Sequence, residues 1–111
     1  MAEFPTDHPQ DPQTWITKAL ADLADARTYA FEGRSVEESL AMRSAGVASV
    51  LAARRTRDRG GELSPLWLEA LAHDDEVEAW QQVDLLQAEY YRERAIHLGL
   101  LAAIELENAT S

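Results

Sequence analysis

Four polar side chains near the C-terminus have a spacing that gathers side chains on one face of a helix. They are Asp84, Gln87, Tyr91 and Arg94, which lie three, four and three residues apart. Residues three or four apart are neighbours on a helix, so these groups can hydrogen-bond with one another or with a facing helix. An unpaired charge inside a protein is costly, so buried charges among them need partners. We therefore predict a satisfied polar network, or a polar contact that sets the register of a dimer. A small binding site or channel between helices is the alternative.

The apolar residues on the same side of this segment predict an interface. At 100° per residue, the apolar stripe is centred near Val83, Leu98 and Leu101, with Trp80 and Tyr90 on its flanks. The predicted interface or buried polar network therefore comprises Trp80, Asp84, Gln87, Tyr90, Tyr91, Arg94, Leu98 and Leu101.

A second candidate is the segment Arg92-Glu-Arg-Ala-Ile-His97, in which four residues separate an arginine from a histidine late in a helical chain. The segment resembles the motif of HEPN-type ribonucleases. The resemblance implies metal-independent cleavage of RNA, with Arg92 and His97 acting as a catalytic pair supplied across a dimer. Glu93 departs from the family pattern, which often has a small polar amide there, and its carboxylate would repel RNA. The alternative for His97 is a helix-surface residue paired with Glu93 one turn earlier.

Two carboxylate–imidazole pairs are candidate metal ligands. Glu69 and His73 lie one helical turn apart, and so do Glu93 and His97. Such pairs on two packed helices could together hold a divalent ion. However, the Glu-x-x-His spacing of di-iron bundles is absent, and we predict no metal and no other cofactor. A metal- or small-ligand-binding bundle remains an alternative interpretation.

The segment from residue 54 to residue 59 is a basic patch in an otherwise acidic chain. Arg54, Arg55, Arg57 and Arg59 are accompanied there by a single acid, Asp58. The patch could contact nucleic-acid phosphates, an acidic protein or the acidic half of a second copy. Aromatic residues do not interleave it, so base stacking is not implied. The favoured interpretation is a helix C-terminus whose positive charge complements the helix dipole.

The composition narrows the classes of protein. The 111 residues carry a net charge of −10, which on average repels nucleic acids and anionic membranes. The absence of cysteine excludes disulfides and thiolate zinc sites. The sequence has no secretory signal and no uncharged apolar run of about 18 residues, so no membrane partner and a cytoplasmic location are expected. Phosphate-binding glycine loops and nucleophile elbows are also absent from the sequence.

Helices must position all of these residues, because apolar positions recur at three- and four-residue spacings and no alternating run predicts a strand. The expected helices span residues 12–32, 35–59, 65–72 and 75–108, with caps at Asp11, Ser35, Ser64, and Asp74 or Asp75. Gly33 and Gly60 are expected to end the first two helices. Four alanines, Ala41, Ala45, Ala48 and Ala52, give the second helix a face that another helix can approach closely.

The last of these helices leads to the main prediction about the fold. Its second half is apolar nearly all round, and such a helix must be covered on every side. At about 1.5 Å per residue it would be about 50 Å long, against about 30 Å for each of the first two helices. We therefore predict an all-α antiparallel bundle of three long helices and one short helix. The long C-terminal helix would be central, and a second subunit would complete its cover in a homodimer.

Residues 1–10 are expected to form a disordered or extended tail, and residues 11–108 a single helical-bundle domain. The favoured function is a small acidic protein-interaction module without catalysis, acting as a dimer. It would serve as a regulator, inhibitor or assembly factor of bacterial or phage origin, with a protein partner of unknown identity. Nucleic acid is expected to bind, if at all, through residues 54–59. A ribonuclease using Arg92 and His97 is the enzymatic alternative.

Overall fold

The computed structural model describes residues 11–110, and within this range the chain forms helices and no strands. The helices are α1 (Pro12–Phe31), α2 (Ser35–Asp58), α3 (Pro65–Trp80) and α4 (Leu85–Thr110). The predicted all-α helical bundle is therefore confirmed for this part of the chain. The predicted tail, residues 1–10, lies outside the described residues.

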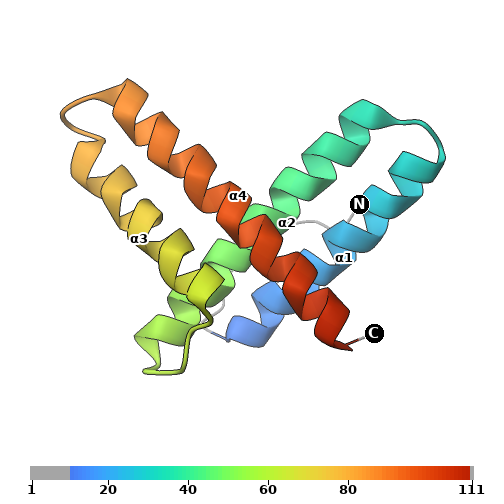
Figure 1. Ribbon diagram of the computed structural model, residues 1–111, viewed down its shortest axis with the longest axis horizontal. Coiled ribbons are helices and arrows are strands. Elements are labelled where there is room, and N and C mark those ends of the chain that lie inside the picture. The colour runs from blue at the N-terminus through green and yellow to red at the C-terminus, as the bar shows by residue number, and fades with distance from the viewer. Residues whose placement is uncertain (1–10, 111) are drawn as a thin grey trace.

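The four helices form two hairpins that cross one another in the shape of an X (Figure 1). α1 lies beside α2 in the first hairpin, and α3 lies beside α4 in the second. α2 crosses α4 near the middle of both helices. The turn of each hairpin lies at an outer end of the X, and we call these ends the α1–α2 tip (residues 31–40) and the α3–α4 tip (residues 81–90).

Side-chain caps explain where two of the helices begin. The carboxylate of Asp11 accepts a hydrogen bond from the backbone N–H of Gln13 (3.0 Å) at the start of α1. The hydroxyl of Ser64 accepts one from the backbone N–H of Trp67 (3.3 Å) at the start of α3. These bonds satisfy N–H groups that have no partner within the helix. Both caps stand where the sequence predicts them.

Glycines end the first two helices. Gly33 and Gly60 have φ angles of 73° and 70°, the left-handed conformation that glycine adopts without steric cost. The predicted cap at Ser35 is wrong, because Ser35 is already helical and the N-cap is Arg34. The backbone N–H of Arg34 donates to the carbonyl of Tyr29 (2.8 Å), so the tight turn after α1 leads directly into α2.

The predicted boundary between the third and fourth helices is also wrong. α3 continues through residues 73–75, and the chain turns at residues 81–84 instead. The carboxylate of Asp84 accepts hydrogen bonds from the backbone N–H groups of Leu86 (3.0 Å) and Gln87 (3.3 Å), so it caps a new helix. α3 therefore has 16 residues and α4 has 26, and a helix of 34 residues does not occur in the described chain.

The crossing of α2 and α4 depends on two glycines. A Cβ atom at Gly46 would lie 2.4 Å from the backbone oxygen of Ile96, and one at Gly99 would lie 2.5 Å from the backbone oxygen of Gly46. Both distances are far below ordinary contact, so any side chain here would push the two helices apart. The predicted alanine face of α2 is also buried: Ala41, Ala45, Ala48 and Ala52 are fully inaccessible to solvent.

The large residues of the core come from all four helices, and they include Trp15, Leu23, Trp67, Leu71 and Leu98. The expectation that α4 is a central post, covered on every side, is wrong. Its buried residues are mainly small and lie on one side, whereas its Leu101 is 39% exposed. The hairpin turn at residues 81–84 explains the difference, because α3 folds back along one side of α4 and α2 crosses it. Part of the surface of α4, including Leu101, therefore stays open to solvent.

A buried ion pair within α1 is connected to α2 through the hydroxyl of Ser44. The ammonium group of Lys18 donates to both carboxylate oxygens of Asp22 (2.8 and 2.9 Å) and lies 3.4 Å from the hydroxyl of Ser44. The Ser44 hydroxyl in turn donates to Asp22 (2.6 Å). Asp22 is completely buried and Lys18 is 5% exposed, so the two buried charges compensate one another.

Candidate interaction groove and hairpin tips

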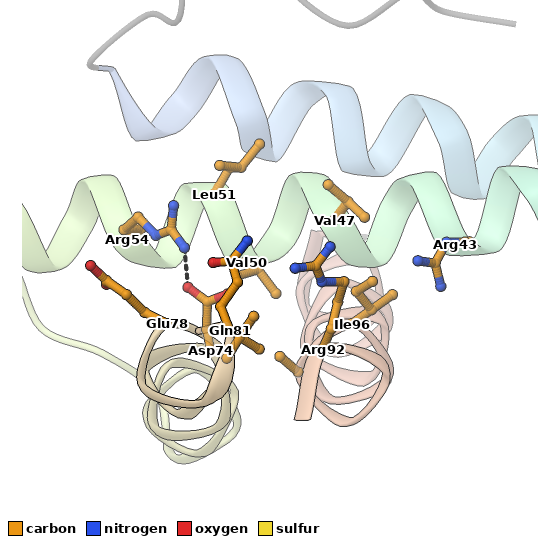
Figure 2. Close-up of a pocket in the computed structure, with 12 residues that line it drawn as sticks. Arg43, Val47, Val50, Leu51, Arg54, Asp74, Glu78, Gln81, Arg92 and Ile96 are labelled. Carbon is orange, nitrogen blue, oxygen red and sulfur yellow. Dashed lines mark hydrogen bonds and ion pairs between the residues drawn. The ribbon is translucent and has the colours of Figure 1, made fainter. Parts of the chain in front are cut away.

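A groove lies between α2 on one side and the α3–α4 hairpin on the other, with a volume of about 560 Å³ (Figure 2). Its floor is apolar and consists of Val47, Val50, Leu51, Val77, Ala95 and Ile96. Its walls are polar or charged and carry Arg43, Arg54, Asp74, Glu78, Gln81 and Arg92. An apolar surface with a few placed polar groups is typical of binding sites. We call this feature the α2 groove.

The face that α2 presents to the groove follows from its sequence. Arg43, Val47, Val50 and Arg54 are four, three and four residues apart, so they lie on one side of the helix. The glycine crossing holds α4 against the same helix, and Arg92 of α4 reaches across toward α2 (Figure 2). Arginines from two helices thus surround one apolar floor.

The three arginines of the groove differ in how firmly they are held. Arg54 forms an ion pair with Asp74 of α3 (Figure 2). Arg43 donates to both carboxylate oxygens of Glu93 on α4 (2.7 and 2.6 Å). The guanidinium of Arg92 lies 3.8 Å from Glu89, at the outer limit for an ion pair. Arg92 is therefore the groove cation whose ionic contact is longest, although its side chain is partly buried.

The predicted basic patch is largely paired with acids. Besides Arg54 with Asp74, Arg57 donates to Asp75 of α3 (3.0 Å). Arg55 lies 4.0 Å from Asp58. The two acids that the sequence predicted as caps of the fourth helix thus face arginines of α2 instead, and Arg59 is the exposed C-cap residue of that helix. These pairs connect the end of α2 to α3.

The hairpin tips expose apolar side chains. Phe31 at the α1–α2 tip is 94% exposed, and Leu86 at the α3–α4 tip is 83% exposed. The other exposed large apolar residues of the two tips are Val36, Leu40, Val83, Leu85 and Tyr90. Clusters of exposed apolar residues mark interaction surfaces in soluble proteins.

The predicted polar line of α4 lies on an exposed side of the helix. Asp84, Gln87 and Arg94 are all exposed, and Asp84 is occupied in capping α4. Tyr91 is partly buried, and its ring meets that of Tyr90 edge to face, with ring centroids 5.3 Å apart. The line is therefore not a buried network within the described chain. Its role in an interface with another molecule stays a prediction.

The remaining residues of the predicted interface are divided between buried and exposed positions. Leu98 is buried in the core, whereas Leu101 is partly open to solvent. Trp80 is partly buried at the end of α3, and its indole N–H donates to Glu76 (3.1 Å). The buried side of α4 instead includes Ala88, Ala95, Gly99, Ala102 and Ala103. Hydropathy predicts that the large apolar side chains of α4 are buried, whereas close packing of the helices buries mainly its small residues.

Arg92 and His97 line different hollows of the surface. Arg92 lies in the α2 groove, and His97 is exposed beside a shallow hollow next to Glu93 and Leu100. Five residues apart on one helix, the two side chains point about 140° apart, so one chain does not bring them together. The ribonuclease interpretation, which needs two chains, stays a prediction.

The predicted metal ligands already have other contacts. Glu93 holds Arg43, and a ring nitrogen of His73 lies 2.9 Å from the backbone oxygen of Glu69. Across residues 11–110 there is no group of three or more His, Cys, Asp or Glu side chains that could hold a metal ion.

An exposed ion pair connects the far end of α4 to α1. Arg27 forms a two-pronged contact with Glu107. The hydrogen bond from Arg27 lowers the pKa of Glu107 below its ordinary value of 4.5, and the same contact raises the pKa of Arg27. Because the guanidinium is 61% exposed, salt screens this attraction.

Comparison with known proteins gives no family, no similar curated protein and no similar solved structure. In residues 11–110, no helix is both long enough and apolar enough to span a bilayer.

Arg43 and the buried pair of Lys18 and Asp22 were not among the residues predicted from the sequence. A signal for Arg43 was present, since it continues the helical face of Val47 and Val50. The four-residue spacing of Lys18 and Asp22 also predicts contact on a helix. Burial of that pair, however, depends on α2, whose Ser44 closes over it.

Proposed function

We propose that this protein is a small acidic interaction module without catalysis that acts as a dimer, in the class of regulators, inhibitors or assembly factors. The observation that carries the proposal is the exposure of large apolar side chains at both hairpin tips, above all Phe31 and Leu86. Covering one such side chain contributes about 1.5–3 kcal/mol. Together the tips therefore supply enough apolar surface to drive association.

The charge of the tips supports a protein as the partner. The α1–α2 tip carries Glu32, Glu37 and Glu38, and the α3–α4 tip carries Asp84 and Glu89. Acidic residues beside an apolar cluster repel nucleic-acid phosphates and anionic lipid headgroups. A second copy of the chain is the partner that we propose, and a regulated target protein would bind in addition to it.

Single cysteines test the proposal, because the chain has none of its own. Phe31→Cys and Leu86→Cys place one thiol at each tip, and Ala24→Cys is the matched control on the exposed side of α1. The rate of labelling with a bulky maleimide is measured as the protein concentration rises. We expect at least one tip thiol to become protected while the thiol at position 24 does not. Labelling rates at both tips that do not fall as the protein concentration rises would contradict the proposal.

A further inference from the structure

We infer that the α2 groove is filled by the α3–α4 tip of a second copy, so that two copies exchange tips reciprocally across a two-fold axis. This inference rests on the proposed function, since it names the surfaces through which the dimer forms. The groove of each copy would bind the α3–α4 tip of the other copy.

The groove has the chemistry to receive an acidic apolar segment. Val47, Val50 and Ile96 offer apolar surface at its floor, and Arg43, Arg54 and Arg92 stand at its walls. The groove also contains Asp74 and Glu78, and two of its arginines already have partners: Arg54 is paired with Asp74, and Arg43 is paired with Glu93. Arg92 remains the cation with the longest ionic contact, so it is the one best placed to meet an incoming carboxylate.

The α3–α4 tip has the matching chemistry. Val83, Leu85 and Leu86 are between 70% and 83% exposed, so their side chains project from the turn. The segment from Gln81 to Tyr91 includes Asp84 and Glu89 and contains no basic residue. The apolar side chains of the tip would pack on the floor of the groove, and the carboxylates of the tip would lie beside the arginines of its walls.

Groove and tip are also continuous with each other. Gln81, the first residue of the tip, and Arg92, two residues beyond its end, both line the groove. A surface that carries a groove next to a complementary projection can pair with itself under a two-fold rotation, with each projection in the other copy's groove. Such an exchange covers both exposed features at once and leaves neither free to form open chains of molecules.

The α1–α2 tip fits the groove less well and provides the matched control. Its apolar residues Phe31 and Val36 flank Arg34, which forms ion pairs with Glu32 and Glu37, whereas the segment from Gln81 to Tyr91 has no basic residue. No residue between 31 and 40 lines the α2 groove, so this tip is not continuous with it. The two tips also lie at separate ends of the X (Figure 1). A substitution at Phe31 should therefore leave this contact unchanged.

Paired charge reversals test the inference. Arg92→Glu and Glu89→Arg are prepared separately, and the affinity of each for itself and for the other is measured by sedimentation velocity with one chain labelled. Glu89 lies 3.8 Å from Arg92 of its own chain, and in the proposed dimer it faces Arg92 of the other copy. Each variant alone therefore places like charges together both within the chain and across the dimer, and recovery in the mixed pair is the result that isolates the contact across the dimer. We expect each variant's self-association to weaken at least tenfold and the mixed pair to recover to within about threefold of the unaltered dimer. Circular dichroism verifies that each variant retains its helices.

Variants with neutral side chains provide the test if a charge-reversal variant does not fold. Arg92→Gln and Glu89→Gln should each weaken the dimer severalfold, Leu86→Ser should weaken it at least tenfold, and Phe31→Ser should leave it unchanged. If the dimer is intact in every Arg92 and Leu86 variant, the inference is overturned while the proposed function stands. The inference is also overturned, and the proposed function stands, if the groove variants still dimerise but no longer bind an acidic helix from another protein. A parent chain that never dimerises would overturn both.

Discussion

The contacts between helices, which we call the seams, differ from the two hairpin tips in how far their residues are buried. At the α2–α4 crossing the backbones approach so closely that Gly46 and Gly99 have no space for a side chain. At the tips, by contrast, Phe31 and Leu86 extend into solvent. The seams are complete within one chain and hold the X together. The tips expose their apolar side chains in the described chain, so we expect changes at the seams to alter folding and changes at the tips to alter association.

The largest effect is expected at the seam between α1 and α2. Asp22→Ala leaves Lys18 buried without its carboxylate, which should lower the free energy of unfolding by about 3–5 kcal/mol. Urea denaturation of dilute protein measures the change. The double variant Lys18→Met/Asp22→Leu removes both charges and should stay much closer to the parent. A loss below about 1 kcal/mol for Asp22→Ala would contradict the account of this seam.

Two leucines offer the sharpest direct contrast between seam and tip. Leu71→Ala creates a cavity at a site that is 2% exposed and should cost about 2–5 kcal/mol. Leu86→Ala removes a side chain that is 83% exposed and should change the unfolding free energy of the monomer by less than about 0.5 kcal/mol. Both are measured by urea denaturation below the concentration at which dimers form. Equal losses at the two positions would remove the distinction on which the comparison depends.

A smaller loss is expected when the crossing is widened by one methyl group. The Cβ of Gly99→Ala would meet a backbone oxygen, and separating the helices should cost about 2 kcal/mol even after the gain in helix propensity. Gly61→Ala is the control, because its closest obstacle is the methyl group of the Thr56 side chain. Thermal unfolding compares the two variants. If Gly99→Ala is as stable as the parent, then the close crossing is not what fixes the angle of the X.

The smallest effect is expected for the exposed pair of Arg27 and Glu107. Because contact with Arg27 lowers the pKa of Glu107 in the folded state, the pair contributes stability above the ordinary value of 4.5. This contribution is lost as the pH falls through the lowered pKa. The difference in melting temperature between the parent and Glu107→Gln should therefore be small at neutral pH and disappear in strong acid. It should also shrink at high salt, and a difference that persists under both conditions would show that the residue acts through packing instead.

The sequence predicted the parts of this fold that local chemistry decides. The caps at Asp11 and Ser64, and the glycine stops at Gly33 and Gly60, depend on neighbours a few residues away, so spacing was enough to find them. The break at residues 81–84 was missed. Asp84 had two compatible roles, as a cap or as a member of a helix face, and only packing of α3 against α4 decides between them.

The candidate site was harder to predict than the fold. The α2 groove combines three successive helices, but Arg43 and Arg54 of α2 are distant in sequence from Arg92 of α4, and they become a group only when the hairpins cross. Hydropathy placed Leu98 of α4 on the buried side correctly but missed the small residues, because a helix that packs at close range also buries Gly99 and alanines, while Leu101 stays partly exposed. The apolar excess near the C-terminus was recognised, but the structure concentrates exposed apolar residues at the tips.

The mass of the unaltered chain in solution tests the central claim most directly. Sedimentation equilibrium over a range of micromolar concentrations should give a species of twice the 12.4 kDa chain mass, with dissociation on dilution. A constant mass of 12.4 kDa at every concentration would contradict the claim that the tips are covered by a second copy.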